Sequence, residues 1–244
     1  GVQSGSVARG GIWFLEAADS HVNYAIMKNG TIGIQADSAK VPNNLVVDVT
    51  NTKIDNMRGI GLIGRGAVMT GNNNLITNCG RACGAFTIGG SYQFEHCTFA
   101  NYWSGATRTE PTFVLNNFFV VGNDVFVREL YDTEFKNCIM WGNNANLTDF
   151  NEFAIAIETS NDLPPAEFFF DHCSVDTDID MTDPVFYNNM INGQSPPFVS
   201  TGSNDYHLTN NLPIWTGTST TVFNDLDQML RSFPPSKGCY EYQP

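Results

Sequence analysis

A short phrase that recurs along the first three quarters of the chain constrains the fold more than any other feature. It starts as NYAIMK at residue 23 and returns as NTKIDN at 51, NNLITN at 73, HCTFAN at 96, NCIMWG at 137 and HCSVDT at 172. The first three intervals are about 22–28 residues, which is the length of one coil in a solenoid. Such a repeat predicts stacked units, none of which buries its apolar face alone.

Aligning the units gives three columns of residues that share a character. The first is polar and holds Asn23, Asn51, Asn73, His96, Asn137 and His172. The second holds Tyr24, Thr52, Asn74, Cys97, Cys138 and Cys173, and the third is apolar and holds Ile26, Ile54, Ile76, Phe99, Met140 and Val175. We expect amide ladders in the first column and full burial of the third. We expect free, buried thiols in the second, since three cysteines at strand spacing cannot all pair.

The repeat predicts an all-β fold, a right-handed parallel β-helix of about six coils over residues 1–183. The remaining residues, 184–244, lose the repeat, and we expect them to form an irregular cap packed on the same solenoid as one domain. Strand-like runs such as TIGIQ and GIGLI follow the phrases, and helical periodicity is scarce. A β-sandwich would not repeat Asn and Cys in columns, and a propeller repeat would span about 40–50 residues.

Composition excludes two classes of partner. Lys plus Arg number 12 against 25 Asp plus Glu, which gives a net charge of −13. A general nucleic-acid binder needs clustered positive charge to displace counterions, so we expect no nucleic acid. No apolar run approaches the roughly 20 residues that span a bilayer, so we expect no transmembrane segment.

Strings near the C-terminus, with FEHCTFANYW and GGIWFLE earlier, resemble a known family. The family comprises the parallel β-helix proteins among Bacteroidetes secreted and surface lipoproteins, including those that end in a choice-of-anchor Q region. The matching residues are Asp183, Pro184, Phe186, Asp205, Tyr206, His207, Leu208, Pro234, Pro235, Gly238, Tyr240, Glu241 and Tyr242, with Cys239 where the family usually has alanine.

The resemblance implies a secreted or cell-surface protein, with a lipid anchor in the full-length precursor as one form of surface attachment. It also implies membership of the pectate-lyase-like superfamily, which includes polysaccharide-active enzymes. The NTD, GHG and RIK strings typical of polygalacturonases do not occur here, so no catalytic residue is carried over.

Two pairs of residues are candidates for binding a glycan. Arg58 and Arg81 lie in a stretch without acidic residues, at near-equivalent positions of consecutive units. Two unpaired guanidinium groups there would clamp a uronate or a sulfate; alternatively, they are solubilising arginines. Tyr102 and Trp103 follow a repeat strand beside a loop. Exposed aromatic rings there would suit sugar rings; alternatively, they pack under the insertion.

Four alternating carboxylates form the one candidate metal site. Asp176, Asp178, Asp180 and Asp183 lie in SVDTDIDMTDP, and calcium takes several oxygen ligands at about 2.3–2.6 Å. The glycine and the late glutamate of an EF-hand loop are missing. We favour a solvated acidic turn, with a calcium site as the functional alternative; no other cofactor is indicated.

The preferred functional hypothesis is an extracellular β-helix that binds polysaccharide, acidic glycans being the expected ligands. One alternative is a polysaccharide lyase or glycoside hydrolase, which as a hydrolase needs two carboxylates facing across about 5–9.5 Å. Glu95 and Asp171 share a column of the alignment, but the sequence assigns no catalytic pair. The other alternative is a structural or adhesion module of the cell surface.

Overall fold

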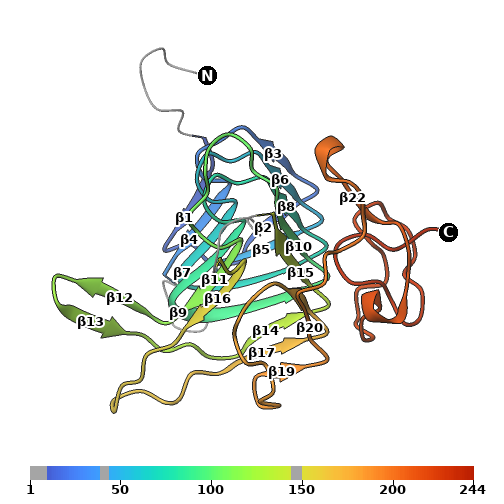
Figure 1. Ribbon diagram of the computed structural model, residues 1–244. Helices are drawn as coiled ribbons and strands as arrows, with labels where there is room; N and C mark the ends of the chain where they lie inside the picture. Colours follow the sequence, from blue (N-terminus) through green and yellow to red (C-terminus); the bar gives the residue numbers. More distant parts are fainter. Residues whose placement is uncertain (1–9, 39–43, 144–149) are drawn as a thin grey trace.

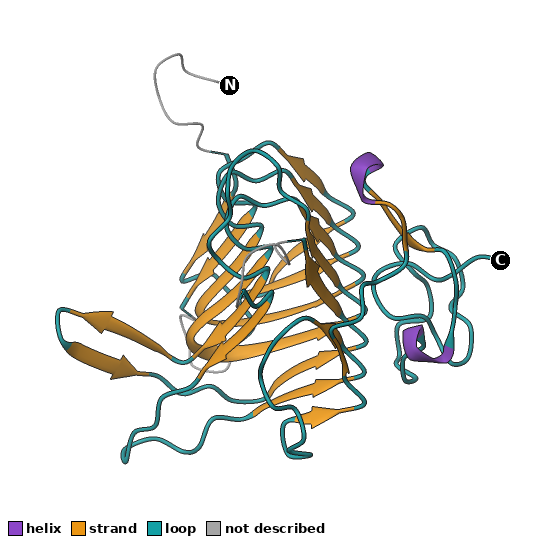
Figure 2. Ribbon diagram, in the orientation of Figure 1, coloured by secondary structure: helices purple, strands orange, loops and turns teal. Residues whose placement is uncertain are grey.

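The protein, described by a computed structural model over residues 10–38, 44–143 and 150–244, is an all-β protein (Figures 1 and 2). Most of the strands among these residues belong to two large sheets of parallel strands. Helical structure in the described residues is limited to two short 3-10 helices, η1 (Thr201–Ser203) and η2 (Pro213–Trp215). Among the same residues, no helix has the length and apolar composition needed to cross a membrane.

The larger sheet contains β1 (Ile12–Leu15), β2 (Ser20–Asn23), β4 (Ile34–Asp37), β5 (Val47–Thr50), β7 (Leu62–Asn72), β9 (Gly84–Glu95), β11 (Phe113–Asn116), β14 (Thr133–Lys136), β16 (Phe153–Ala156), β17 (Phe168–Asp171) and β19 (Tyr187–Asn188). The second sheet contains β3 (Ile26–Lys28), β6 (Lys53–Asp55), β8 (Leu75–Thr77), β10 (Thr98–Asn101), β15 (Ile139–Gly142), β18 (Ser174–Val175) and β20 (Ile191–Asn192). Two antiparallel hairpins are β12 (Phe118–Val121) with β13 (Asp124–Val127), which projects from the sheets in Figure 1, and β21 (Phe198–Ser200) with β22 (Asp205–Leu208).

Successive passes of the chain pair strand on strand in the second sheet, as the repeat alignment predicts. Ile54 lies opposite Ile76, Ile76 opposite Phe99, and Phe99 opposite Met140. These four side chains and Val175 are fully buried. The predicted apolar column is therefore confirmed from Ile54 onward.

The first pass is shifted by one residue from the prediction. Met27, not Ile26, lies opposite Ile54, and Ile26 is 69% exposed. The alignment matched Asn23 to Asn51, whereas Tyr24 (φ 52°) shares the left-handed turn conformation of Asn51 (φ 47°). The position of the turn sets the register, and a one-residue slip moves each side chain to the opposite face.

The polar column forms a hydrogen-bonded ladder at the strand-to-strand turn. The Nδ2 of Asn73 donates to Oδ1 of Asn51 at 3.2 Å, and Asn51 donates to Asn23 at 3.1 Å. Further along, Nδ2 of Asn137 lies 3.1 Å from Nε2 of His96. Burial, and then the charge of Arg231, lower the pKa of His96 well below its usual value, so a neutral ring accepts this bond. Asparagine tolerates the left-handed turn. The predicted amide ladder is confirmed from Asn23 to Asn73, and an imidazole replaces one of the amides at the step from Asn137 to His96.

All six cysteines are free and buried, as expected for the cysteine column. The backbone N–H of Cys97 donates to Sγ of Cys138 at 3.5 Å, and Sγ of Cys173 donates to the carbonyl oxygen of Phe135 at 3.2 Å. Burial is the main reason why the pKa of Cys138 is raised, with the Cys173 and Cys97 thiols next. The Cys138 thiol therefore stays protonated, and all three side chains fill space in the core.

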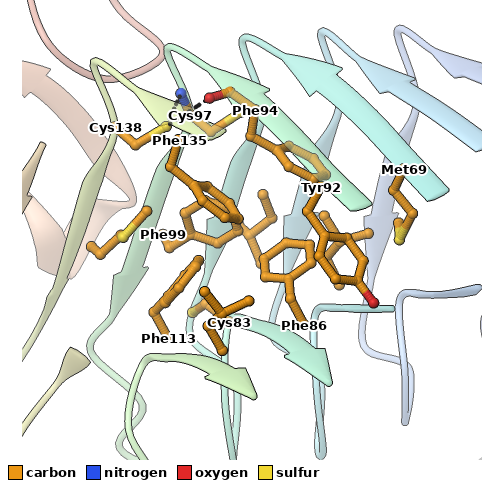
Figure 3. Close-up of a cluster of buried hydrophobic side chains, with 14 of the residues drawn as sticks. Met69, Cys83, Phe86, Tyr92, Phe94, Cys97, Phe99, Phe113, Phe135 and Cys138 are labelled. Atoms are coloured by element: carbon orange, nitrogen blue, oxygen red, sulfur yellow. Dashed lines mark hydrogen bonds between the residues drawn. The ribbon is translucent and has the colours of Figure 1, made fainter. Parts of the chain in front are cut away.

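Aromatic rings fill the middle of the core (Figure 3). The ring of Phe86 lies 4.9 Å from that of Tyr92, 5.1 Å from Phe94 and 5.2 Å from Phe135, measured between centroids. A Cβ atom at Gly64 would lie 2.5 Å from Cε1 of Tyr92. Only glycine at this position leaves room for the Tyr92 ring.

The stack extends one pass beyond the six that the sequence predicts. In β19 Tyr187 lies opposite Phe170, and in β20 Ile191 lies opposite Ser174. Asn189 has φ 48° and takes the turn position of this pass. The sequence hides it because the interval from His172 is shorter than the others. The paired strands therefore continue beyond the predicted boundary at residue 183.

The C-terminal segment, orange to red in Figure 1, packs on the outer face of the second sheet. Tyr206 and Tyr240 form one buried cluster with Leu75 and Ala100. Trp215 belongs to a second cluster built on β15. The expected cap therefore covers one side of the sheet.

Lys237 in this segment is a buried lysine that should lower the stability of the fold in a pH-dependent way. Its side chain is 2% exposed, and burial lowers its pKa from 10.5 to about 8, against the opposing effects of Cys173 and Asp171. Near pH 7 the folded state therefore holds a buried positive charge. At about 1.4 kcal/mol per unit of pKa shift, this charge lowers the free energy of unfolding by about 3 kcal/mol. We expect Lys237→Met to raise the free energy of unfolding by that order in denaturant titrations.

The same linkage fixes how stability changes with pH. Between about pH 8 and pH 10.5 the unfolded chain keeps the Lys237 proton and the folded chain does not. The free energy of unfolding of the wild type therefore rises with pH in this range. The Lys237→Met variant should lose this rise, whereas Lys28→Met, at a half-exposed lysine, should keep it. Equal stability of wild type and Lys237→Met near pH 7 would contradict the prediction.

Candidate functional site

A cleft of about 340 Å³ lies where the second sheet meets the C-terminal segment. Three neighbouring parallel strands, β6, β8 and β10, end at it, and η1 and the residue after it form the opposite wall. The described residues that line it are Asp55, Asn56, Asn78, Tyr102, Trp103, Ser104, Gly105, Thr201, Gly202 and Asn204. Because Asp55 pairs with Thr77, and Thr77 with Ala100, these strand ends are in register.

Asn78 fastens the two walls of the cleft to each other. Its Nδ2 donates to Oδ1 of Asp55 at 3.0 Å and to Oδ1 of Asn204 at 2.7 Å. Its Oδ1 accepts from the Tyr206 hydroxyl at 3.3 Å. Thr77 also donates to Oδ1 of Asp55, at 3.0 Å. The left-handed turn at Asn78 (φ 52°) aims its amide at both walls.

Several polar atoms at the cleft have no hydrogen-bond partner among the described residues. Oδ2 of Asp55 is engaged only by Nζ of Lys28, at 3.8 Å. Asn56 uses its Nδ2 on Asn29 at 2.6 Å and leaves its Oδ1 open. Asn204 uses its Oδ1 on Asn78 and leaves its Nδ2 open. The cleft thus offers a carboxylate oxygen, an amide acceptor and an amide donor to a ligand.

The structure brings both predicted aromatic residues to this cleft. Trp103 is partly exposed, and its ring packs so closely on Gly105 that a Cβ there would lie 2.6 Å from Cζ2. Tyr102 packs toward the C-terminal segment, 6.1 Å from the Tyr206 ring and 6.4 Å from Phe198 between centroids. Burial, and then the charge of Glu152, raise the pKa of Tyr102 to about 12. Both rings are partly exposed, but Trp103 makes no such ring contact with the described residues, so its face is the one we consider available to a ligand.

A buried ion pair holds the loop that carries Trp103. Nη2 of Arg108 lies 2.6 Å from Oε1 of Glu152, and the two side chains are 1% and 0% exposed. Oε2 of Glu152 accepts from the Thr112 hydroxyl at 2.6 Å, and Nη1 of Arg108 donates to the carbonyl of Glu110 at 2.7 Å. Sequence analysis missed this pair because its members lie in separate insertions.

Arg58 and Arg81 do not form the predicted clamp for an anion. Backbone bonds from Gly80 to Met57 and from Arg81 to Gly59 place Arg81 beside Gly59, one residue away from Arg58. Nε of Arg81 also donates to Oε1 of Glu110 at 2.6 Å, so the premise of two unpaired arginines is wrong. Neither residue is among those that line the cleft.

The four aspartates proposed for calcium do not converge. Within the described residues, no group of three or more His, Cys, Asp or Glu side chains could hold a metal ion. Oδ1 of Asp180 accepts the N–H of Thr182 at 3.0 Å, and Oδ1 of Asp183 accepts that of Val185 at 2.9 Å. The alternating carboxylates therefore stabilise local turns, and Asp176 and Asp178 join no ligand set.

A second polar row runs across the larger sheet, away from the cleft. Glu95 lies opposite Lys136, and Lys136 opposite Asp171, so the two carboxylate residues are two strand spacings apart, about 9–10 Å between backbones. Asp171 accepts from Nδ2 of Asn188 at 2.8 Å and lies 2.7 Å from Nδ1 of His172. Burial and then Glu134 raise the pKa of Glu95, against the effect of Lys136. The shared column is confirmed, but Lys136 lies between the two residues on the intervening strand, with its Nζ 3.0 Å from Oε1 of Glu134.

Comparisons of the chain with protein-family models, with curated proteins and with solved structures gave no significant match. The resemblance to surface β-helix proteins therefore stays a prediction, and the function has to be argued from the cleft itself.

Proposed function

We propose that this protein is a right-handed parallel β-helix that binds polysaccharide in the cleft beside Trp103. The parallel register of successive passes and the ladder through Asn51 and Asn73 support the β-helix. The polysaccharide ligand implies a protein at the cell surface or outside the cell, as the sequence resemblance also does.

One observation carries the proposal: an open tryptophan ring lies in the same cleft as unsatisfied hydroxyl-binding groups. A sugar ring presents an apolar face that packs on an indole, and a rim of hydroxyls that donate and accept hydrogen bonds. Binding sites combine such apolar surface with a few placed polar groups. Trp103 would supply the surface, and Asp55, Asn56 and Asn204 would supply the polar groups.

We expect Trp103→Ala to weaken polysaccharide binding by about tenfold or more, since burial of a large apolar side chain contributes about 1.5–3 kcal/mol. Isothermal titration calorimetry against soluble polysaccharides measures this directly. Phe223→Ala is the matched control, because Phe223 is an aromatic residue that is 70% exposed and does not line the cleft. Equal affinities of Trp103→Ala and Phe223→Ala would refute a role for the cleft.

A further inference from the structure

The cleft beside Trp103 has negative but no positive charge among its described lining residues. Asp55 supplies the charge, while the other lining residues are amides, hydroxyls, aromatic rings and glycine. Burial holds the phenol of Tyr102 neutral, since it raises its pKa to about 12. Arg58 and Arg81 lie outside the lining.

The lysine that pairs with Asp55 only partly offsets this charge. Nζ of Lys28 lies 3.8 Å from Oδ2 of Asp55, and the lysine side chain is 53% exposed. Ion pairs of this kind are weak, because water screens them. A uronate that entered the cleft would bring a second carboxylate close to Asp55, and like charges brought together across an interface disfavour binding.

The same groups suit an uncharged sugar. The open Oδ2 of Asp55 can accept hydrogen bonds from one or two hydroxyls, and bonds to a charged acceptor are stronger than neutral ones. Oδ1 of Asn56 can accept a hydroxyl and Nδ2 of Asn204 can donate to one, as neither has a partner among the described residues. Each of these groups pairs with a hydroxyl and none requires an anion.

We propose that the cleft selects uncharged polysaccharides and rejects uronate polymers, with Asp55 as the residue that determines this selectivity. The inference rests on the proposed function and reverses the preference for acidic glycans that Arg58 and Arg81 suggested. The cleft volume of about 340 Å³ is near the lower end for small-ligand sites, so it holds a short stretch of the polymer.

Calorimetry with two panels of oligosaccharides tests the inference. One panel is neutral, from glucans, mannans and xylans, and the other is oligogalacturonate of matched length. We expect wild type to bind at least one neutral oligosaccharide about tenfold or more tighter than any oligogalacturonate. Because no ligand charge is involved, that affinity should barely change between low and high salt. Tighter binding of oligogalacturonate would overturn the inference but leave glycan binding standing, whereas binding of neither panel would overturn both.

Two variants assign the selectivity to Asp55. Asp55→Asn should lower the affinity for the neutral oligosaccharide, because the variant loses a charged acceptor. It should also reduce the ratio of the neutral to the oligogalacturonate affinity, because the variant removes the charge that repels the uronate. Lys28 is half exposed, and its replacement by glutamine leaves the hydrogen bonds of Asp55 intact. Lys28→Gln should therefore increase the ratio of neutral to oligogalacturonate affinity. This variant tests the role of Asp55 even if Asp55→Asn fails to fold. An unchanged ratio in Lys28→Gln and in folded Asp55→Asn would contradict the role of Asp55.

Discussion

Replacing Ile76 with aspartate is expected to lower the free energy of unfolding by about 4 kcal/mol or more. Ile76 is fully buried, with Ile54 and Phe99 opposite it in the neighbouring strands. A Cβ at Gly61 would lie 2.3 Å from Cγ2 of Ile76, so no space is left for water around the new carboxylate. Denaturant titration followed by circular dichroism gives the size of the loss.

Ile26→Asp is the matched control for this change. Ile26 belongs to the same sheet and was predicted in the same column, but it is 69% exposed. We expect its replacement to shift stability by no more than about 0.5 kcal/mol, as for most surface substitutions. Similar losses of stability for Ile26→Asp and Ile76→Asp would contradict the observed register. They would mean that Ile26, and not Met27, is buried opposite Ile54.

The second large effect is expected for Glu152→Ala, which should cost about 3–5 kcal/mol because it leaves a buried arginine without its carboxylate. Thr112 loses a bond to the carboxylate as well. A Cβ at Gly142 would lie 2.2 Å from Oε1 of Glu152, so the site is close-packed and the shortened side chain leaves a cavity. Unfolding in guanidinium chloride measures the loss.

The same change should also weaken glycan binding, because Arg108 holds the loop that carries Trp103. Glu134→Ala is the control, as Glu134 forms a more exposed pair with Lys136 at 3.0 Å, and such pairs contribute about 1 kcal/mol or less. A stable Glu152→Ala variant with unchanged affinity would show that the buried pair does not position the cleft.

Columns of like residues predicted the core better than they predicted its ends. From Thr52 and Ile54 onward each unit repeats both polar and apolar residues, so the alignment fixes which residues stack. At the first unit the alignment matched Asn23 to Asn51 because both are asparagines. The turn residue equivalent to Asn51 is Tyr24, so the predicted register was wrong by one residue. At the last unit the short interval before Asn189 hid a whole pass.

The candidate site was only half predictable, for a physical reason. Tyr102 and Trp103 stand out because they follow a repeat strand, but the wall opposite them comes from Asn204 in the C-terminal segment. Nothing in the repeat says where that segment docks. Likewise, Glu110 lies in an insertion whose path no column fixes, so its pairing with Arg81 could not be foreseen.

The most direct test of the central claim is a crystal structure of the protein with the tightest-binding oligosaccharide. We predict a sugar ring packed on the indole of Trp103, with one hydroxyl bonded to Oδ2 of Asp55 and others to Asn56 and Asn204. An oligosaccharide bound instead along the row of Glu95, Lys136 and Asp171, with the Trp103 cleft empty, would contradict the account.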